Sequence, residues 1–200
     1  MNRPAVFLDK DGTVVADVPF NVDPSAIRPA RRAREGLQQL ANSGLPLFII
    51  SNQPGIAFGR FDEDELRGVH RELRRLFADC GATLAGFYYC PHHPDGVRSP
   101  YACSCQCRKP EPGLLLGAAR EHGLTLRRSW MIGDILDDIE AGNRAGCRTI
   151  LIDNGGETEW RRAPLRTPTH IVRDLAEAAR IVMGTGLALA AFERPREAVR

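Results

Sequence analysis

Short apolar runs alternate with helix-like segments along most of this 200-residue chain, and this alternation constrains the fold more than any other feature. The runs that we expect to be strands cover residues 5–8, 46–51, 86–90, 130–132 and 148–153, with a further short strand near Ile171. Helical patterns cover residues 30–42, 62–80, 112–123 and 137–145, and a last helix begins at Asp174. Strands that alternate with helices in this way favour a doubly wound parallel α/β sheet with helices on both faces.

The composition is that of an ordinary globular domain, with 43% hydrophobic and 26% charged residues. A formal net charge of only +2 argues against a general affinity for nucleic acid or for a membrane surface. Residues 1–4 lead directly into a strand, which is unlike a signal peptide, and no apolar stretch is long enough to span a bilayer. We therefore expect a cytoplasmic monomer, with one domain over residues 1–183 and a C-terminal tail over 184–200.

Residue types that can carry chemistry follow several of these strands. Asp9 and Asp11 come directly after the first strand, Ser51 ends the second, and Asp134 follows the strand over 130–132. Because the carboxyl ends of parallel strands meet at one edge of a sheet, we expect these residues to converge there with the loop that carries Lys109. Paired carboxylates can share a divalent cation, or one can attack while the other moves protons. By itself, an Asp pair is also common in surface turns.

A second cluster of reactive side chains lies in the loop over residues 90–107. Its principal members are Cys90, His92, Cys105 and Cys107. Three thiolates and one imidazole are the ligands of a closed, structural zinc site. Cys103 and His93 are further candidates, so the spacing does not fix the four ligands, and an irregular loop with oxidisable thiols is the alternative. A loop of this length usually needs an internal staple, and zinc here would also fix the residues that follow it.

Four motifs carry a family resemblance. DKDGT at 9–13, IISNQ at 49–53, RKP at 108–110 and GDILDD at 133–138 are similar, in the same order, to the motifs of the haloacid dehalogenase superfamily of phosphatases. The resemblance implies that superfamily's Rossmann-like core and a phosphorylated aspartate as intermediate. The implied roles are Asp9 as nucleophile, Asp11 as general acid and base, and Ser51 and Lys109 as partners of the phosphoryl group.

The same resemblance implies a catalytic Mg²⁺. Mg²⁺ would be held by Asp9, the backbone carbonyl of Asp11 and Asp134, because a phosphate dianion and a carboxylate repel each other without a cation between them. Asn52 and Arg108 would bind the substrate. Two acids of the last motif stay open: Asp137 is either a helix N-cap or a metal ligand, and Asp138 either binds the metal or supports its ligands.

Further sequence features narrow the resemblance within the superfamily. YYCPHHP at 88–94, CQCRKP at 105–110 and SNQPGIAFGRF at 51–61 are similar to bacterial phosphatases that remove the 7-phosphate from D-glycero-manno-heptose 1,7-bisphosphate, on the way to lipopolysaccharide core or related heptose nucleotides. Histidinol-phosphate phosphatases share the C-x-H and C-x-C pairs and are the alternative. The chain leaves no room for a large cap domain, so the site should be open, with the 90–107 loop as a partial roof.

Two other classes of protein use related chemistry. A receiver-type signalling domain is also phosphorylated on an aspartate, but Asp11 would promote turnover and so argues for an enzyme. A phosphatase that acts on nucleic-acid ends should carry a stronger basic surface than this chain does. We therefore expect a small sugar bisphosphate as the partner, and neither nucleic acid nor membrane.

Overall fold

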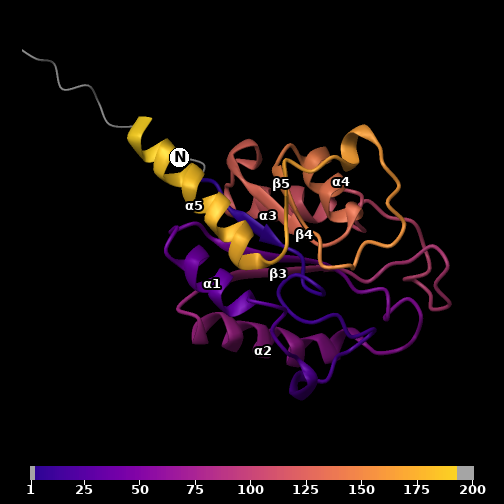
Figure 1. The fold of residues 1–200 in the computed structure, drawn as a ribbon. Helices are drawn as coiled ribbons and strands as arrows, with labels where there is room; N and C mark the ends of the chain where they lie inside the picture. The colour runs from indigo at the N-terminus through magenta and orange to yellow at the C-terminus, as the bar shows by residue number, and fades with distance from the viewer. Residues whose placement is uncertain (1–2, 193–200) are drawn as a thin grey trace, which may run out of the picture.

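The expected strands form one parallel sheet in the order β3-β2-β1-β4-β5-β6. The computed structural model describes residues 3–192 (Figure 1). The strands are β1 (Val6–Leu8), β2 (Leu47–Asn52), β3 (Leu84–Cys90), β4 (Trp130–Gly133), β5 (Arg148–Ile152) and β6 (His170–Val172). From β1 the chain builds outward through β2 to β3, then returns to the other side of β1 to form β4. This reversal of direction opens a crevice beyond the carboxyl ends of β1 and β4, where ligands bind in sheets of this kind.

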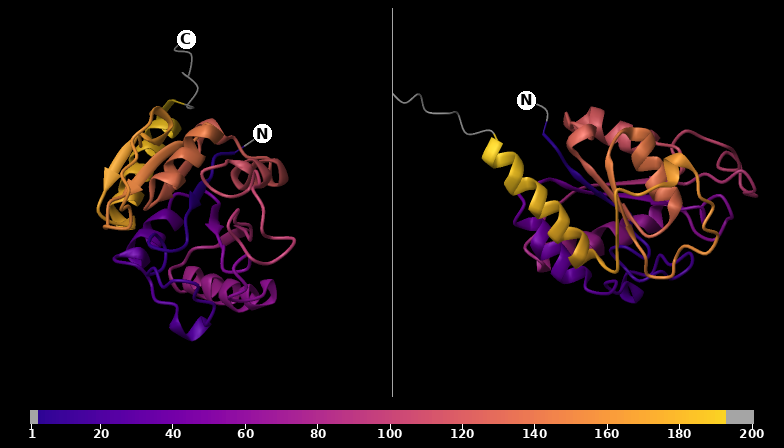
Figure 2. Two further views of the ribbon diagram at one scale, coloured as in Figure 1. Left: turned by 90° about the vertical axis from the view of Figure 1, so that its right-hand side faces the viewer. Right: turned by 45° about the horizontal axis from the view of Figure 1, so that its top comes forward.

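Helices cover both faces of the sheet, as the sequence predicted. They are α1 (Ala33–Ala41), α2 (Leu66–Asp79), α3 (Gly113–His122), α4 (Leu136–Ala145) and α5 (Leu175–Phe192). Helices α1, α2 and α5 pack on one face, and α3 and α4 pack on the other (Figures 1 and 2). Short 3₁₀ helices lie at Pro24–Ala26, Glu63–Glu65, Leu126–Arg128 and Pro164–Arg166. The expected doubly wound α/β fold is confirmed, and no large cap domain is present in residues 3–192.

The continuous apolar runs follow from burial on both faces. Within β1, Val6 and Leu8 belong to the core under α1, α2 and α5, whereas Phe7 belongs to the core under α3 and α4. The Phe7 ring stacks on that of Phe48 in β2, with 5.5 Å between the ring centroids. A polar face would leave one of these two cores incomplete, so the strands that flank the crevice have no alternation of polar and apolar residues.

Local signals set the ends of several helices. The backbone N–H of Asp62 donates to Oε2 of Glu65 at 2.8 Å, which is half of the capping box that the sequence predicted. Helix α3 ends at Gly123, whose φ of 60° lies in the left-handed region that glycine adopts without strain.

The C-terminal part of the chain continues as helix beyond the expected domain boundary. Helix α5 runs to Phe192, so the boundary expected after residue 183 falls inside a helix. The remainder of the expected tail, residues 193–200, lies outside the described residues, and the division into a domain and a tail stays a prediction. Within the described range, none of the helices combines the length and the apolar character that a membrane span requires.

The contact between α1 and α5 leads to a stability prediction. A Cβ atom on Gly36 of α1 would lie 2.7 Å from the backbone carbonyl carbon of Leu175, whereas one on Gly117 of α3 would meet nothing within 4 Å. We expect Gly36→Ala to lower the free energy of unfolding by about 1–3 kcal/mol through overpacking. The matched control Gly117→Ala should raise it by up to about 1 kcal/mol, because alanine favours helix. Urea unfolding of both variants measures the two effects, and a stabilised Gly36→Ala variant would contradict the close packing.

Candidate active site

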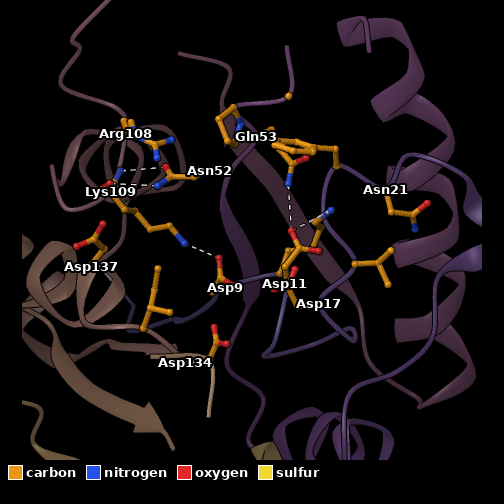
Figure 3. Close-up of a pocket in the computed structure, with 17 residues that line it drawn as sticks. Asp9, Asp11, Asp17, Asn21, Asn52, Gln53, Arg108, Lys109, Asp134 and Asp137 are labelled. Carbon is orange, nitrogen blue, oxygen red and sulfur yellow. Dashed lines mark hydrogen bonds and ion pairs between the residues drawn. The ribbon is translucent and has the colours of Figure 1, made fainter. Parts of the chain in front are cut away.

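The expected loops converge on one cleft of about 270 Å³ at the carboxyl edge of the sheet (Figure 3). Its inner wall carries residues of the four sequence motifs: Asp9, Asp11, Asn52, Gln53, Arg108, Lys109 and Asp134. Its outer wall comes from the irregular segment between β1 and α1, through Asp17, Val18, Phe20 and Asn21. The inner wall is therefore charged, and we call it the charged floor of the cleft. The outer wall has mixed polarity.

Lys109 lies at the centre of the charged floor, and its side chain is almost completely buried. Its Nζ pairs with the Asp9 carboxylate, lies 2.6 Å from Oδ1 of Asp138, and donates to the backbone carbonyl of Ile50 at 3.0 Å. Burial alone would lower the pKa of Lys109, but the carboxylates of Asp138 and Asp9 outweigh burial and hold that pKa above its usual value. The side chain is thus a fixed positive charge beside Asp9.

Three buried carboxylates share this floor. Oxygen atoms of Asp9, Asp134 and Asp138 all lie within 4.8 Å of one another. Burial, with the charges of Asp9 and Asp138 adding to it, raises the pKa of Asp134 to about 8. When all three acids are ionised, their charge exceeds that of the one ammonium, and a divalent cation with oxygen ligands would neutralise the excess. The donor set therefore fits Mg²⁺, with Asp138 as a candidate ligand beside the expected Asp9 and Asp134.

Glycines make room for these carboxylates. A Cβ atom on Gly12, whose φ is +78°, would lie 1.9 Å from Oδ2 of Asp134, and one on Gly156 would lie 2.4 Å from the same oxygen. On Gly133 it would lie 2.2 Å from Oδ2 of Asp138. The side-chain amide of Asn154 donates to the carbonyl of Gly12 at 2.7 Å and ties the chain after β5 to the chain after β1. Sequence reasoning missed Asn154 and Gly156, because neither lies in a motif.

Asp11 stands beside Asp9 at the mouth of the cleft. Its Oδ2 lies 3.2 Å from Nζ of Lys10 and accepts a hydrogen bond from Nε2 of Gln53 at 3.4 Å. Burial raises the pKa of Asp11 to about 6, while the charge of Lys10 works in the opposite direction. A carboxyl group with such a pKa retains more of its protonated form near neutral pH than an ordinary aspartate does, which suits a general acid.

The polar residues at the end of β2 connect the loops to one another. Ser51 is buried, and its Oγ accepts a hydrogen bond from Nε2 of Gln53 at 2.8 Å. Asn52 forms a reciprocal pair with the backbone of Lys109, accepting from its N–H at 3.0 Å and donating to its carbonyl at 3.1 Å. Asn52 therefore lines the cleft and also secures the loop that delivers Lys109. Gln53 lies in one of the motifs, but the sequence assigned it no role. In the structure its Nε2 donates to both Ser51 and Asp11.

The two remaining acids after β4 have different surroundings. Ile135 is the N-cap residue of α4, so an N-cap role for Asp137 is wrong. Asp137 is the second residue of α4 and pairs with Arg166, outside the carboxylate group. The capping hydrogen bond comes instead from Asp138, whose Oδ2 accepts from the N–H of Ile135 at 3.2 Å. Asp138 thus touches both the helix start and Lys109.

The second cluster, which we call the Cys/His cluster, lies beside the cleft. Its members are the four expected side chains, Cys90, His92, Cys105 and Cys107, and their candidate ligand atoms all lie within 4.8 Å of one another. The three sulfur atoms are 3.1–3.5 Å apart, and Nδ1 of His92 lies 3.3 Å from Sγ of Cys107. Such close approach of three thiols and an imidazole fits a tetrahedral zinc ion. The spare candidates lie outside this group; His93 accepts a hydrogen bond from the N–H of Asp95 through Nδ1 at 3.1 Å.

Arg108 connects the Cys/His cluster to the cleft. Its backbone N–H donates to Sγ of Cys105 at 3.3 Å, and its Nη1 donates to the carbonyl of His92 at 3.5 Å. Its side chain lines the cleft beside Lys109 (Figure 3). The geometry agrees with the expectation that the loop orients both cations.

Comparisons with known proteins agree with this arrangement. Residues 106–178 match the family described as HAD-hydrolase-like. The D-glycero-β-D-manno-heptose-1,7-bisphosphate 7-phosphatase of Photorhabdus laumondii is 36% identical, over 90% of this chain and 96% of that protein. The enzyme of the same name from Yersinia pestis is 36% identical, over 76% of this chain and 81% of that protein.

The chain is also similar to a solved structure of an enzyme from the same group. The D,D-heptose 1,7-bisphosphate phosphatase of B. bronchiseptica, complexed with magnesium and phosphate, has a TM-score of 0.74 and 28% identity, over 91% of this chain and 99% of that one. The fold and the sequence identity over most of the length of these relatives agree. The protein therefore belongs to the haloacid dehalogenase-like family of phosphatases, in the same group as these heptose-bisphosphate enzymes.

Proposed function

We propose that this phosphatase removes the 7-phosphate from D-glycero-β-D-manno-heptose 1,7-bisphosphate, in the formation of lipopolysaccharide core or a related heptose nucleotide. The observation that carries the proposal is the pairing of buried Asp9 with Lys109 at the floor of the cleft, with Asp11 beside them. The names of relatives that match almost the whole chain support this choice of substrate.

The reaction proceeds in two steps on Asp9. A carboxylate oxygen of Asp9 attacks phosphorus, the bond from phosphorus to the C7 oxygen breaks, and Asp11 gives its proton to that oxygen. A water molecule then attacks the aspartyl-phosphate, Asp11 takes a proton from the water, and the bond from phosphorus to Asp9 breaks to release inorganic phosphate. Lys109 and the hydroxyl of Ser51 stabilise the charge on the transferring group throughout.

Two metal ions complete the proposal. Mg²⁺ held by Asp9, Asp134 and the backbone carbonyl of Asp11, with Asp138 as a further candidate, would neutralise charge on the phosphoryl group. Zinc held by Cys90, His92, Cys105 and Cys107 would be structural, because four protein ligands leave no position open for catalysis. Its contribution would be to hold the loop that presents Arg108 and Lys109.

Arg108 is the candidate partner of the second phosphate. Lys109 is committed to Asp9 and Asp138. The Arg108 guanidinium lines the cleft, and within residues 3–192 its only hydrogen bond is a long one to the carbonyl of His92 at 3.5 Å. A guanidinium can bind a phosphate through two parallel hydrogen bonds. Binding energy from a phosphate remote from the reaction then orients the reacting end of the sugar.

Substitutions of the two aspartates test the mechanism. Asp9→Asn keeps nearly the same shape but removes the attacking charge, so we expect it to lose essentially all turnover. Asp11→Asn should lose most of the turnover, by about 10²–10⁴-fold, because it removes general acid and base catalysis. Steady-state phosphate release measures both, and mass spectrometry of Asp11→Asn tests for a trapped phospho-enzyme. Near-normal activity of Asp9→Asn would contradict the nucleophile.

The zinc assignment is tested by elemental analysis of the purified protein. We expect about one zinc per chain from the single four-ligand set. Cys107→Ser should lower the zinc content and impair activity through Arg108 and Lys109. Cys103→Ser, in the same loop, is the matched control and should leave both unchanged. Equal loss of zinc in the two variants would show that the ligand set is wrong.

The second-phosphate contact is tested by Arg108→Ala. We expect kcat/KM to fall by an amount equivalent to about 1.5–3 kcal/mol on the bisphosphate, and much less on the heptose 7-monophosphate. Arg98→Ala is the control, because Arg98 lies in the same loop but pairs with Asp62 outside the cleft. Equal losses on both substrates, or a wild-type preference for histidinol phosphate, would contradict the heptose bisphosphate.

A further inference from the structure

The side chain of Gln53 occupies a position that the mechanism above does not use. It follows Asn52, the last residue of β2, and only 4% of its surface is exposed. Its Nε2 donates to Oγ of Ser51 at 2.8 Å. The same nitrogen donates to Oδ2 of Asp11 at 3.4 Å (Figure 3). An amide nitrogen carries two hydrogens, so both donors of this group are committed to residues of the catalytic floor.

The chemistry of the neighbours fixes the orientation of this amide. Oδ2 of Asp11 lies 3.2 Å from the Lys10 ammonium and so stays an acceptor even when Oδ1 carries a proton; the carbonyl oxygen of Gln53 would repel it if the amide were turned round. With nitrogen facing Asp11, one N–H reaches Asp11 and the other reaches Ser51. Asp11 therefore sets the orientation of the Gln53 amide. The same orientation directs the second N–H of Gln53 toward Oγ of Ser51.

The contact with Ser51 determines where its hydroxyl hydrogen can go. Because Nε2 of Gln53 donates to Oγ, it occupies an acceptor position of the Ser51 hydroxyl and leaves the O–H free as a donor. A phosphoryl oxygen in the cleft is an acceptor and so would find a donor already turned toward it. Without Gln53, the hydroxyl could rotate among other partners.

The contact with Asp11 distinguishes its two carboxylate oxygens. In the described residues, both groups that hold this carboxylate reach Oδ2: Nε2 of Gln53 at 3.4 Å and Nζ of Lys10 at 3.2 Å. A proton is best carried by the oxygen that has no such donors, because a donor competes with it. Gln53 and Lys10 together thus leave Oδ1 as the oxygen that carries the proton toward the leaving group.

We propose that Gln53 is a positioning residue that holds Asp11 in the geometry for proton transfer and turns the Ser51 hydroxyl toward the phosphoryl group. The inference rests on the proposed function, since it acts through Asp11 as general acid. It predicts that the importance of Gln53 depends on the leaving group. An alkyl alkoxide needs a proton as it departs, whereas p-nitrophenolate departs without one.

The experiment compares kcat/KM for the heptose bisphosphate and for p-nitrophenyl phosphate, since kcat/KM reports the first chemical step. Gln53→Met removes both donors at similar length. We expect this variant to lose about tenfold or more kcat/KM on the heptose bisphosphate relative to p-nitrophenyl phosphate. This difference is part of the larger effect that losing the general acid itself would have. Gln39→Met, on α1 away from the cleft, is the matched control and should behave as wild type on both substrates.

The outcomes separate this inference from the proposed function. Asp11→Asn is the reference variant: if it loses activity equally on both substrates, the general acid is misassigned and this inference fails with it. If the wild-type protein does not hydrolyse the heptose bisphosphate, the proposed function fails. If Asp11→Asn depends on the leaving group but Gln53→Met does not, only the role of Gln53 is overturned. If Gln53→Met fails to fold, Gln53→Asn is compared in the same way on the two substrates. This variant keeps the amide but shortens the side chain by one methylene.

Discussion

The rest of the site depends on the ion pairs that the buried ammonium of Lys109 forms. It joins the carboxylate of Asp9, which follows β1, to that of Asp138, which belongs to α4. Three acids so close together could not all ionise in a low-dielectric interior without a cation among them. Removing that charge would leave buried carboxylates uncompensated, so the same ammonium supports both the fold at this edge and the chemistry proposed there.

The topology of the sheet explains how one lysine reaches both acids. β1 and β4 are neighbours, so the residues that follow them lie side by side even though they are separated by more than 120 positions along the chain. Lys109 comes from neither strand but from the loop after the Cys/His cluster, and Asn52 at the end of β2 holds that loop through its backbone. Four segments thus meet at the point where the strand order reverses: those that follow β1 and β4, the end of β2, and the loop that carries Lys109.

Much of this arrangement could be predicted from the sequence, because apolar runs mark buried strands and the residues after them must lie at one edge. The convergence of Asp9 and Asp134 follows from that rule alone, whereas Lys109 lies in a long loop after β3 and its place was expected from the motif resemblance. The pairing of Asp137 with Arg166, the bridge made by Gln53 and the approach of Gly156 to Asp134 could not be predicted. Each depends on the direction of a side chain or on the path of a distant loop, which no local periodicity encodes.

Glycines that lie against Asp134 and Asp138 divide the cleft into two regions with different tolerance of substitution. Gly12, Gly133 and Gly156 press so closely on these carboxylates that any larger residue would displace them. The outer wall between β1 and α1, by contrast, exposes Phe20 to solvent. Evolution of new substrates on this scaffold would therefore proceed through the outer wall, while the inner region keeps one reaction.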